Sequence, residues 1–171
     1  LAISRVFDGI TDPVIGFLSD RFKTRWGRRK PFVLIGLPIY ILGVWLLWIP
    51  PIEFGEVTWF GISFNIGYPY LLLVLMIMYI GATIKDVPYS AWGAELATDY
   101  NERTLVMSWK EAFTVAGSLI GALTPAMLVF WGYTKPTDNV YFLTIAIAII
   151  MPILVFNMLV TVPEYPVKDK S

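Results

Sequence analysis

The chain has 171 residues, of which 57% are hydrophobic and only 15% are charged, and its 13 lysines and arginines balance 13 aspartates and glutamates. A soluble domain is usually about a quarter charged, so this composition predicts a membrane protein. The lack of cysteine and histidine excludes disulfide scaffolds, cysteine nucleophiles and histidine-dependent zinc sites, and a balanced charge without a basic domain excludes nucleic acid as a partner.

Five apolar segments predict helices that cross a lipid bilayer, because a span needs about 20 mostly apolar residues. Four are clean and the first is interrupted by polar residues; the predicted spans are residues 1–18, 31–50, 69–96, 105–131 and 140–162. The predicted fold class is an all-α membrane protein, with residues 1–171 as a single incomplete transmembrane domain. The chain starts at leucine without the charged region or cleavage site of a signal peptide, so we expect it to begin within a longer protein.

The loop between the first two spans, residues 19–30, is called the basic loop here because it contains six lysines and arginines. When the other loops and the C-terminal tail are included, ten of the 13 lysines and arginines lie on the same side of the membrane as the basic loop, and only Lys135 lies on the opposite side. Cytoplasmic loops carry such an excess. We therefore expect a multi-pass protein of the cell membrane, with the basic loop and the C-terminus in the cytoplasm.

The first span carries Arg5, Asp8 and Asp12, whose spacings of three and four place them on one helical face. An ionised aspartate at the centre of a membrane helix costs about 2.5–3.5 kcal/mol, so such residues are functional candidates. A structural Arg5–Asp8 ion pair is the alternative, and it leaves Asp12 unexplained.

The third span contains a second polar group, in which Thr83, Asp86 and Ser90 share a face. Lys85 lies about 100° round the helix and could serve a different partner, such as an acid on a neighbouring helix. Asp12 and Asp86 lie at matching depths, about 12 Å and about 13–14 Å from the same boundary. Oxygen donors at one depth suit Na⁺ or a proton, and we expect no other metal or cofactor. Neither aspartate lies in the Gly-x-Gly-Asp motif of intramembrane proteases, so an enzyme is not expected.

The basic loop and its flanks have the pattern G-x-x-x-D-R followed by G-R-R. A cluster that merely sets topology would explain the cations. It would not explain Gly16, which permits close helix approach, or Asp20, which lies at the unfavourable end of a helix dipole and needs cationic neighbours. We predict a breakable salt-bridge latch, formed by Gly16, Asp20, Arg21, Gly27, Arg28, Arg29 and, across the loop, Glu95, although a solvated run of charges would look the same around Glu95. The pattern resembles the loop between the second and third helices of the major facilitator superfamily.

The resemblance narrows when other segments are included. Arg5-Val-Phe-Asp8-Gly-Ile-Thr-Asp12-Pro13, the basic loop and Asp86-Val-Pro88-Tyr89 resemble the glycoside–pentoside–hexuronide:cation symporters, the group of the melibiose permease. The likeness covers essentially the whole chain and aligns it with helices two to six of twelve. It implies a partial N-terminal six-helix bundle, completed by a first helix and a C-terminal half of the same transporter.

The resemblance also implies roles for single residues. The family's cation site corresponds to Asp8, Asp12, Thr83 and Asp86, and its sugar pocket to Arg5, Asp86 and Lys110, with Glu111 the other candidate for the last position. Tyr89 is a candidate wall of that pocket, although helix packing would explain it equally well. Ser90 stands where the melibiose permease has a tryptophan, and Lys85 could supply a built-in positive charge that favours a proton over Na⁺.

The function that follows from the resemblance is a cation-coupled symporter of a sugar or glycoside, driven by Na⁺ or H⁺ and working by alternating access in the lipid bilayer. Two alternatives stay open. One is transport of another solute, such as a lysolipid, and the other is a non-transporting membrane partner that keeps only the fold.

Overall fold

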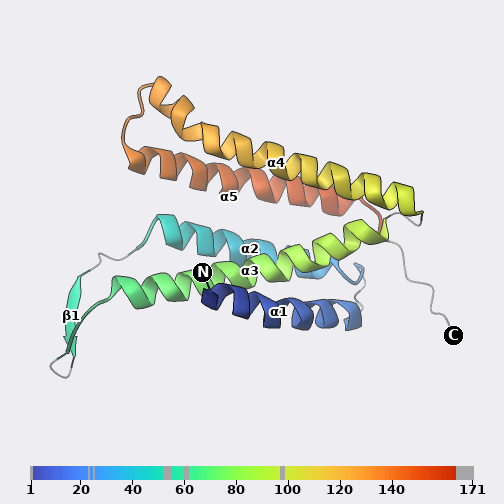
Figure 1. Cartoon of the computed structure of the whole chain (residues 1–171), viewed down its shortest axis with the longest axis horizontal. Helices are drawn as coiled ribbons and strands as arrows, with labels where there is room; N and C mark the ends of the chain where they lie inside the picture. Colours follow the sequence, from blue (N-terminus) through green and yellow to red (C-terminus); the bar gives the residue numbers. More distant parts are fainter. Residues whose placement is uncertain are drawn as a thin grey trace.

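The computed structural model describes residues 2–22, 24, 26–51, 55–59, 62–96 and 99–164; the side chains of residues 2–8, 10, 56–59, 62–64 and 136 lie outside this description. Five helices dominate it: α1 Ala2–Arg21, α2 Lys30–Trp48, α3 Gly67–Glu95, α4 Tyr100–Phe130 and α5 Pro136–Thr161 (Figure 1). The chain therefore has the predicted helical membrane fold.

The loop expected between the second and third spans contains a short antiparallel hairpin. Strand β1, Glu56–Trp59, pairs with β2, Ile62–Asn65, in a register that sets Glu56 opposite Asn65. The sequence of these strands is rich in β-branched and aromatic residues, which favour a pleated surface. The segment between these two spans was predicted as a connection without strands, and this prediction was wrong.

Two helices begin earlier than their apolar cores. Helix α4 starts at Tyr100, because the side chain of Asp99 accepts a 3.2 Å hydrogen bond from the backbone N–H of Asn101 and caps the first turn. Helix α5 starts at Pro136, a residue type that is favoured in the first turn. Polar residues near a span were therefore wrongly assigned to the loops.

Helices α2 and α3 pack with their backbones in close contact at three glycines. A Cβ atom added to Gly36 would lie 2.7 Å from the backbone nitrogen of Lys85, and one at Gly43 would lie 2.7 Å from the Cα of Met78. On α3, a Cβ at Gly81 would lie 2.4 Å from the nitrogen of Tyr40. Small residues permit this kind of approach in membrane helices.

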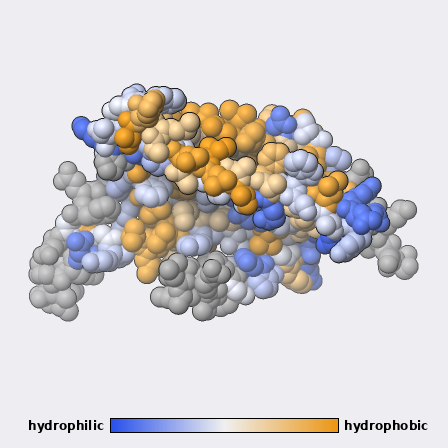
Figure 2. Space-filling view, turned by 45° about the horizontal axis from the view of Figure 1, so that its top comes forward, coloured by the Kyte–Doolittle hydropathy of each residue, from blue (hydrophilic) through white to orange (hydrophobic). Residues whose placement is uncertain are grey.

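The remaining helices flank this pair. Helix α1 packs on α3 and α5 packs on α2, while α4 lies beside α5 and also contacts α3 (Figure 1). Few apolar side chains in the described part are buried, and those are Val33, Leu37, Val44, Val74, Trp92 and Leu128. Apolar side chains instead cover the middle of the face formed by α4 and α5, with hydrophilic ones toward the ends (Figure 2). Such a surface is stable against lipid or further helices.

Four of the described helical segments are long and apolar enough to cross a membrane: Lys30–Trp48, Gly67–Glu95, Tyr100–Phe130 and Thr137–Thr161. Helix α1 is not one of them, since Arg5, Asp8 and Asp12 interrupt its apolar sequence. Its crossing of the bilayer stays a prediction, which further helices around those charges would make favourable.

Candidate functional site

The polar group on α3 contains a buried lysine paired with the aspartate that follows it. Lys85 is buried because Gly36 lets α2 lie directly against its backbone. The Lys85 ammonium group donates a hydrogen bond to Asp86 and lies 4.7 Å from the ring centre of Tyr40 on α2. Asp86 itself is 56% exposed at its side chain. The carboxylate is therefore held by a cation on one side and open on the other.

The predicted cation site is only partly within the described side chains. Thr83 is buried and Asp12, on α1, is exposed. The side chains of Arg5 and Asp8 lie outside the description. Among the described side chains, no group of three or more acidic residues is placed to hold a metal ion. The assignment of this site stays a prediction.

A second polar contact joins α3 to α4. Lys110 donates a 2.8 Å hydrogen bond from its ammonium group to the hydroxyl of Ser90. The same ammonium lies 5.5 Å from the ring centre of Tyr89, a cation–π distance. Lys110, a predicted site residue, is thus brought into direct contact with Ser90 of the polar group on α3, which sequence spacing alone did not indicate.

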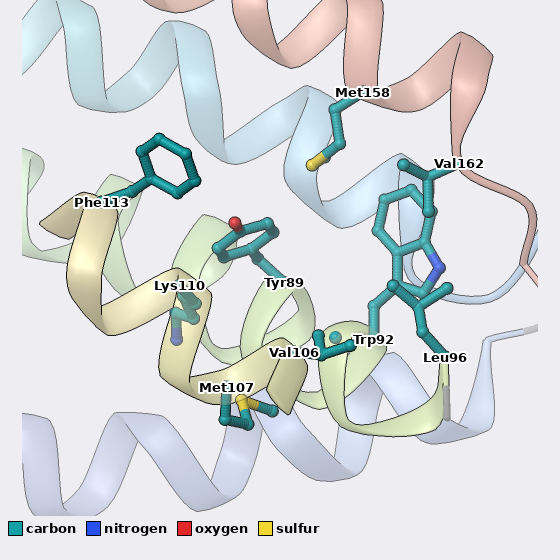
Figure 3. A pocket seen from close by; sticks show the side chains of 10 residues that line it. Tyr89, Trp92, Leu96, Val106, Met107, Lys110, Phe113, Met158 and Val162 are labelled. Atoms are coloured by element: carbon teal, nitrogen blue, oxygen red, sulfur yellow. The ribbon is translucent and has the colours of Figure 1, made fainter. Parts of the chain in front are cut away.

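Lys110 and Tyr89 border a cavity of about 240 Å³ between α3, α4 and α5. In Figure 3, Tyr89 and Trp92 come from α3, Lys110 and Phe113 from α4, and Met158 from α5. The other residues around it are Gly93, Leu96, Val106, Met107 and Val162. The cavity is mostly apolar and aromatic, with one ammonium group. It can hold a small molecule that offers both an apolar face and hydrogen-bond acceptors.

The structure separates the two candidates for the sugar-contacting position on α4. Lys110 faces Ser90 and Tyr89, whereas Glu111 borders a shallow hollow lined also by Tyr100 and Arg103. Of the two, Lys110 is the one that reaches the cavity.

The basic loop brings two arginines to two acids from different helices. The Nη2 atom of Arg29 lies 2.6 Å from the Oε1 atom of Glu95 on α3 and 3.3 Å from the Oδ1 atom of Asp20 on α1. Arg28 lies 2.8 Å from the same Glu95 oxygen and 3.7 Å from Asp20. Arg29 is buried, whereas the acids are partly exposed. The cluster joins the ends of α1 and α3, and partly exposed pairs of this kind break at modest cost.

Two other residues predicted for the latch lie differently. The guanidinium of Arg21 stacks 5.4 Å from the ring centre of Phe17 on its own helix rather than joining the described ion pairs. A Cβ atom at Gly16 would lie 3.8 Å from the Cγ1 atom of Val87, an ordinary contact distance. Alanine would therefore fit at this position, so Gly16 is not required for the α1–α3 approach seen here.

Sequence reasoning missed three residues at this end of the molecule. Glu164 accepts hydrogen bonds from the backbone of the basic loop, Lys30 bonds to the end of α5, and Trp92 donates to the carbonyl of Pro163. The signal that could have indicated Glu164 was an acid just after the last span, on the side of the membrane predicted for the basic loop.

Comparison with known proteins identifies the family of the chain. The family model described as MFS/sugar transport protein matches residues 1–171. The chain is 35% identical to an uncharacterized symporter of Synechocystis over 72% of its length, and 34% identical to a candidate glycoside/cation symporter of Escherichia coli over 68%. It is also 30% identical to a sodium-dependent lysophosphatidylcholine symporter of Danio rerio over 81%.

The chain spans 22%, 24% and 24% of the lengths of these three relatives. All three are described as symporters, which are transporters rather than enzymes, and the matching region is a multi-pass membrane segment. The chain belongs to the MFS/sugar transport protein family.

Proposed function

We propose that the chain is part of the N-terminal half of a cation-coupled symporter that works by alternating access, with a sugar or glycoside as its solute. The observation that carries the proposal is the pair of Lys85 and Asp86 within the membrane-spanning helix α3. Ionisable residues in such helices are costly and commonly mark ion or substrate pathways. A missing first helix and C-terminal half would complete the pathway, as alternating access requires.

In this proposal Asp8, Asp12, Thr83 and Asp86 bind Na⁺ or a proton. Lys85 competes with the coupling ion for Asp86, because both are cations directed at one carboxylate. When the ion binds, it neutralises carboxylates that repel one another, and the affinity for solute rises. Such reciprocal coupling typically amounts to about 1–3 kcal/mol.

The solute would bind in and beside the cavity between α3, α4 and α5. Lys110 and the Ser90 hydroxyl offer hydrogen-bond donors to sugar hydroxyls, and the rings of Tyr89, Trp92 and Phe113 offer apolar faces for a pyranose. Arg5 and Asp86 would contact the solute from α1 and α3. A relative described as a glycoside/cation symporter supports this class of solute.

The apolar character of the cavity favours a second candidate, an amphiphile such as a lysolipid. Leu96, Met107, Met158 and Val162 suit an acyl chain, and the Lys110 ammonium suits an anionic head group. A relative described as a lysophosphatidylcholine symporter points in the same direction.

The latch of Arg28 and Arg29 with Asp20 and Glu95 would close the pathway on the side of the basic loop. We place that side in the cytoplasm of the cell, following the excess of cations. Its partly exposed ion pairs could break and re-form during each transport cycle, since they are worth little individually.

Uptake by the complete transporter in liposomes tests these proposals. A panel of labelled glycosides and lysophospholipids is offered under a Na⁺ gradient and, separately, a pH gradient. We expect one solute class to accumulate under one gradient, and Lys110→Ala to raise its KM about tenfold or more, since hydrogen bonds to charged groups are worth about 1.5–3 kcal/mol. Lys135→Ala, in the opposite loop, is the matched control. Failure of both gradients to drive any solute would contradict the proposal and favour a non-transporting partner.

A further inference from the structure

At the basic loop, a residue that follows α5 caps the start of α2, and a residue of α2 caps the end of α5. The Oε1 atom of Glu164, which follows α5, accepts hydrogen bonds from the backbone N–H groups of Arg28 at 2.7 Å and Arg29 at 2.9 Å. In return Lys30, the first residue of α2, donates a 2.9 Å hydrogen bond to the carbonyl of Leu159 in the last turn of α5. Each helix end receives the charge that its dipole favours and a partner for backbone groups that have none within the helix.

The loop backbone is shaped around the Glu164 carboxylate. Gly27 has a φ of +113°, which disfavours any residue with a side chain. A Cβ atom at this position would lie 2.0 Å from the Oε2 atom of Glu164. The carboxylate thus occupies space that only a glycine at position 27 leaves free.

The position of Glu164 is also fixed from α3. The indole N–H of Trp92 donates a 3.2 Å hydrogen bond to the carbonyl of Pro163, the residue before Glu164. The Lys30 ammonium lies 5.2 Å from the Trp92 ring centre, a cation–π distance. The segment that carries Glu164 is therefore joined to α3 through Trp92 and to α2 through Lys30.

We propose that Glu164 is a positioning residue of the latch, an inference that rests on the gating role given to the latch in the proposed function. Glu164 binds the backbone of Arg28 and Arg29, and the side chains of the same two arginines bind Asp20 and Glu95. It acts through the arginines because it fixes the peptide groups from which they extend. Loss of Glu164 releases those peptide groups and weakens the latch, so that the end of α5 and the latch open together.

The test is a double-mutant cycle in the complete transporter, read out without any solute. Met107 is replaced by cysteine in a cysteine-free background, and its rate of alkylation by N-ethylmaleimide is measured. Met107 is suitable because its methyl group packs on Gly93, two residues before Glu95, so separation of α3 and α4 exposes it. The variants are Glu164→Ala, Glu95→Gln and the two combined. The control is Asp138→Asn, an acid in the first turn of α5 at the opposite end.

We expect Glu164→Ala to raise the alkylation rate about fivefold, which is the change in the opening equilibrium that corresponds to the ~1 kcal/mol typically lost with a helix cap. Glu95→Gln opens the same latch, so the combined variant should alkylate no faster than the faster single variant. Glu164→Gln keeps an acceptor oxygen without the charge, so it should raise the alkylation rate less than Glu164→Ala does. The glutamine variant replaces the alanine variant in the test if the alanine variant does not fold.

Independent effects that multiply in the combined variant, or an unchanged rate in both Glu164 variants, would overturn the inference. Because alkylation needs no transported solute, a failed uptake assay would count against the proposed function alone. The labelling rates would still decide the role of Glu164.

Discussion

Lys85 donates a hydrogen bond to Asp86, its neighbour on the same helix. If Lys85 competes with the coupling ion for this carboxylate, its removal should strengthen ion binding. We expect Lys85→Met, which keeps the apolar stem, to lower the half-saturating Na⁺ or proton concentration about tenfold, equivalent to ~1.4 kcal/mol. The measurement is solute uptake as a function of ion concentration.

Lys135→Met is the control for the loss of one positive charge, since Lys135 lies exposed in a loop. An unchanged or higher half-saturating concentration in Lys85→Met would show that Lys85 does not compete with the ion.

The contact between α2 and α3 should be the part of the structure least tolerant of added volume. Gly43→Ala places a Cβ atom 2.8 Å from the backbone nitrogen of Met78, so the two helices must separate. We expect a loss of about 1–3 kcal/mol in the free energy of unfolding, the usual cost of overpacking. Thermal denaturation in detergent measures it.

Gly121→Ala on α4 is the matched control, because no described atom lies within 4 Å of its added Cβ. Replacing a mid-helix glycine by alanine there should be neutral or stabilising. Equal losses at positions 43 and 121 would contradict the packing described for α2 and α3.

Alanine substitutions at two glycines with positive φ distinguish the stability cost of backbone strain from the cost of the contact with Glu164. Gly27 and Gly132 have φ values of +113° and +93°, but only Gly27 has a described atom in the space of its Cβ. Gly132→Ala should cost about 1–2 kcal/mol from the backbone alone, and Gly27→Ala should cost more. In a Glu164→Ala background the two costs should become similar. A Gly27→Ala cost that does not change in that background would show that the carboxylate does not occupy this space in the protein.

The orientation proposed for the chain can be tested with two exposed aromatic residues at opposite ends of the helices, one in the basic loop and one in the first turn of α3. Trp26 and Tyr68 are 71% and 77% exposed, and the chain has no cysteine of its own. In intact cells a membrane-impermeant maleimide should label Tyr68→Cys and leave Trp26→Cys unlabelled until the membrane is permeabilised. The reverse pattern would place the basic loop outside the cell.

Length, apolarity and charge predicted the helices because a bilayer requires about 20 apolar residues per span. The same features predicted that Asp20, Arg28, Arg29 and Glu95 lie on one side of the membrane. In the structure these four residues form ion pairs with one another. The hairpin was missed because its strands lie in a short loop whose pairing has no strong turn signal. Helix ends were misplaced where capping by Asp99 extended α4 beyond its apolar core.

The contacts of individual lysines could not be predicted from helical spacing. Helical spacing allowed Lys85 a partner other than Asp86, whereas in the structure its long side chain donates a hydrogen bond to Asp86 while α2 packs against the Lys85 backbone. The hydrogen bonds of Glu164 to the start of α2 and of Lys30 to the end of α5 form only because α2 and α5 are antiparallel neighbours. That arrangement follows from three-dimensional packing, which a single sequence does not contain.

The proposed coupling depends most on the acidic residues of the membrane helices, so the decisive variant replaces one of them by its neutral isostere. The measurement is cation-dependent uptake by the complete transporter carrying Asp12→Asn. We expect uptake under an ion gradient to fall to the level seen without the gradient, while the protein still folds and inserts. Unchanged uptake with unchanged ion dependence would contradict the proposed coupling.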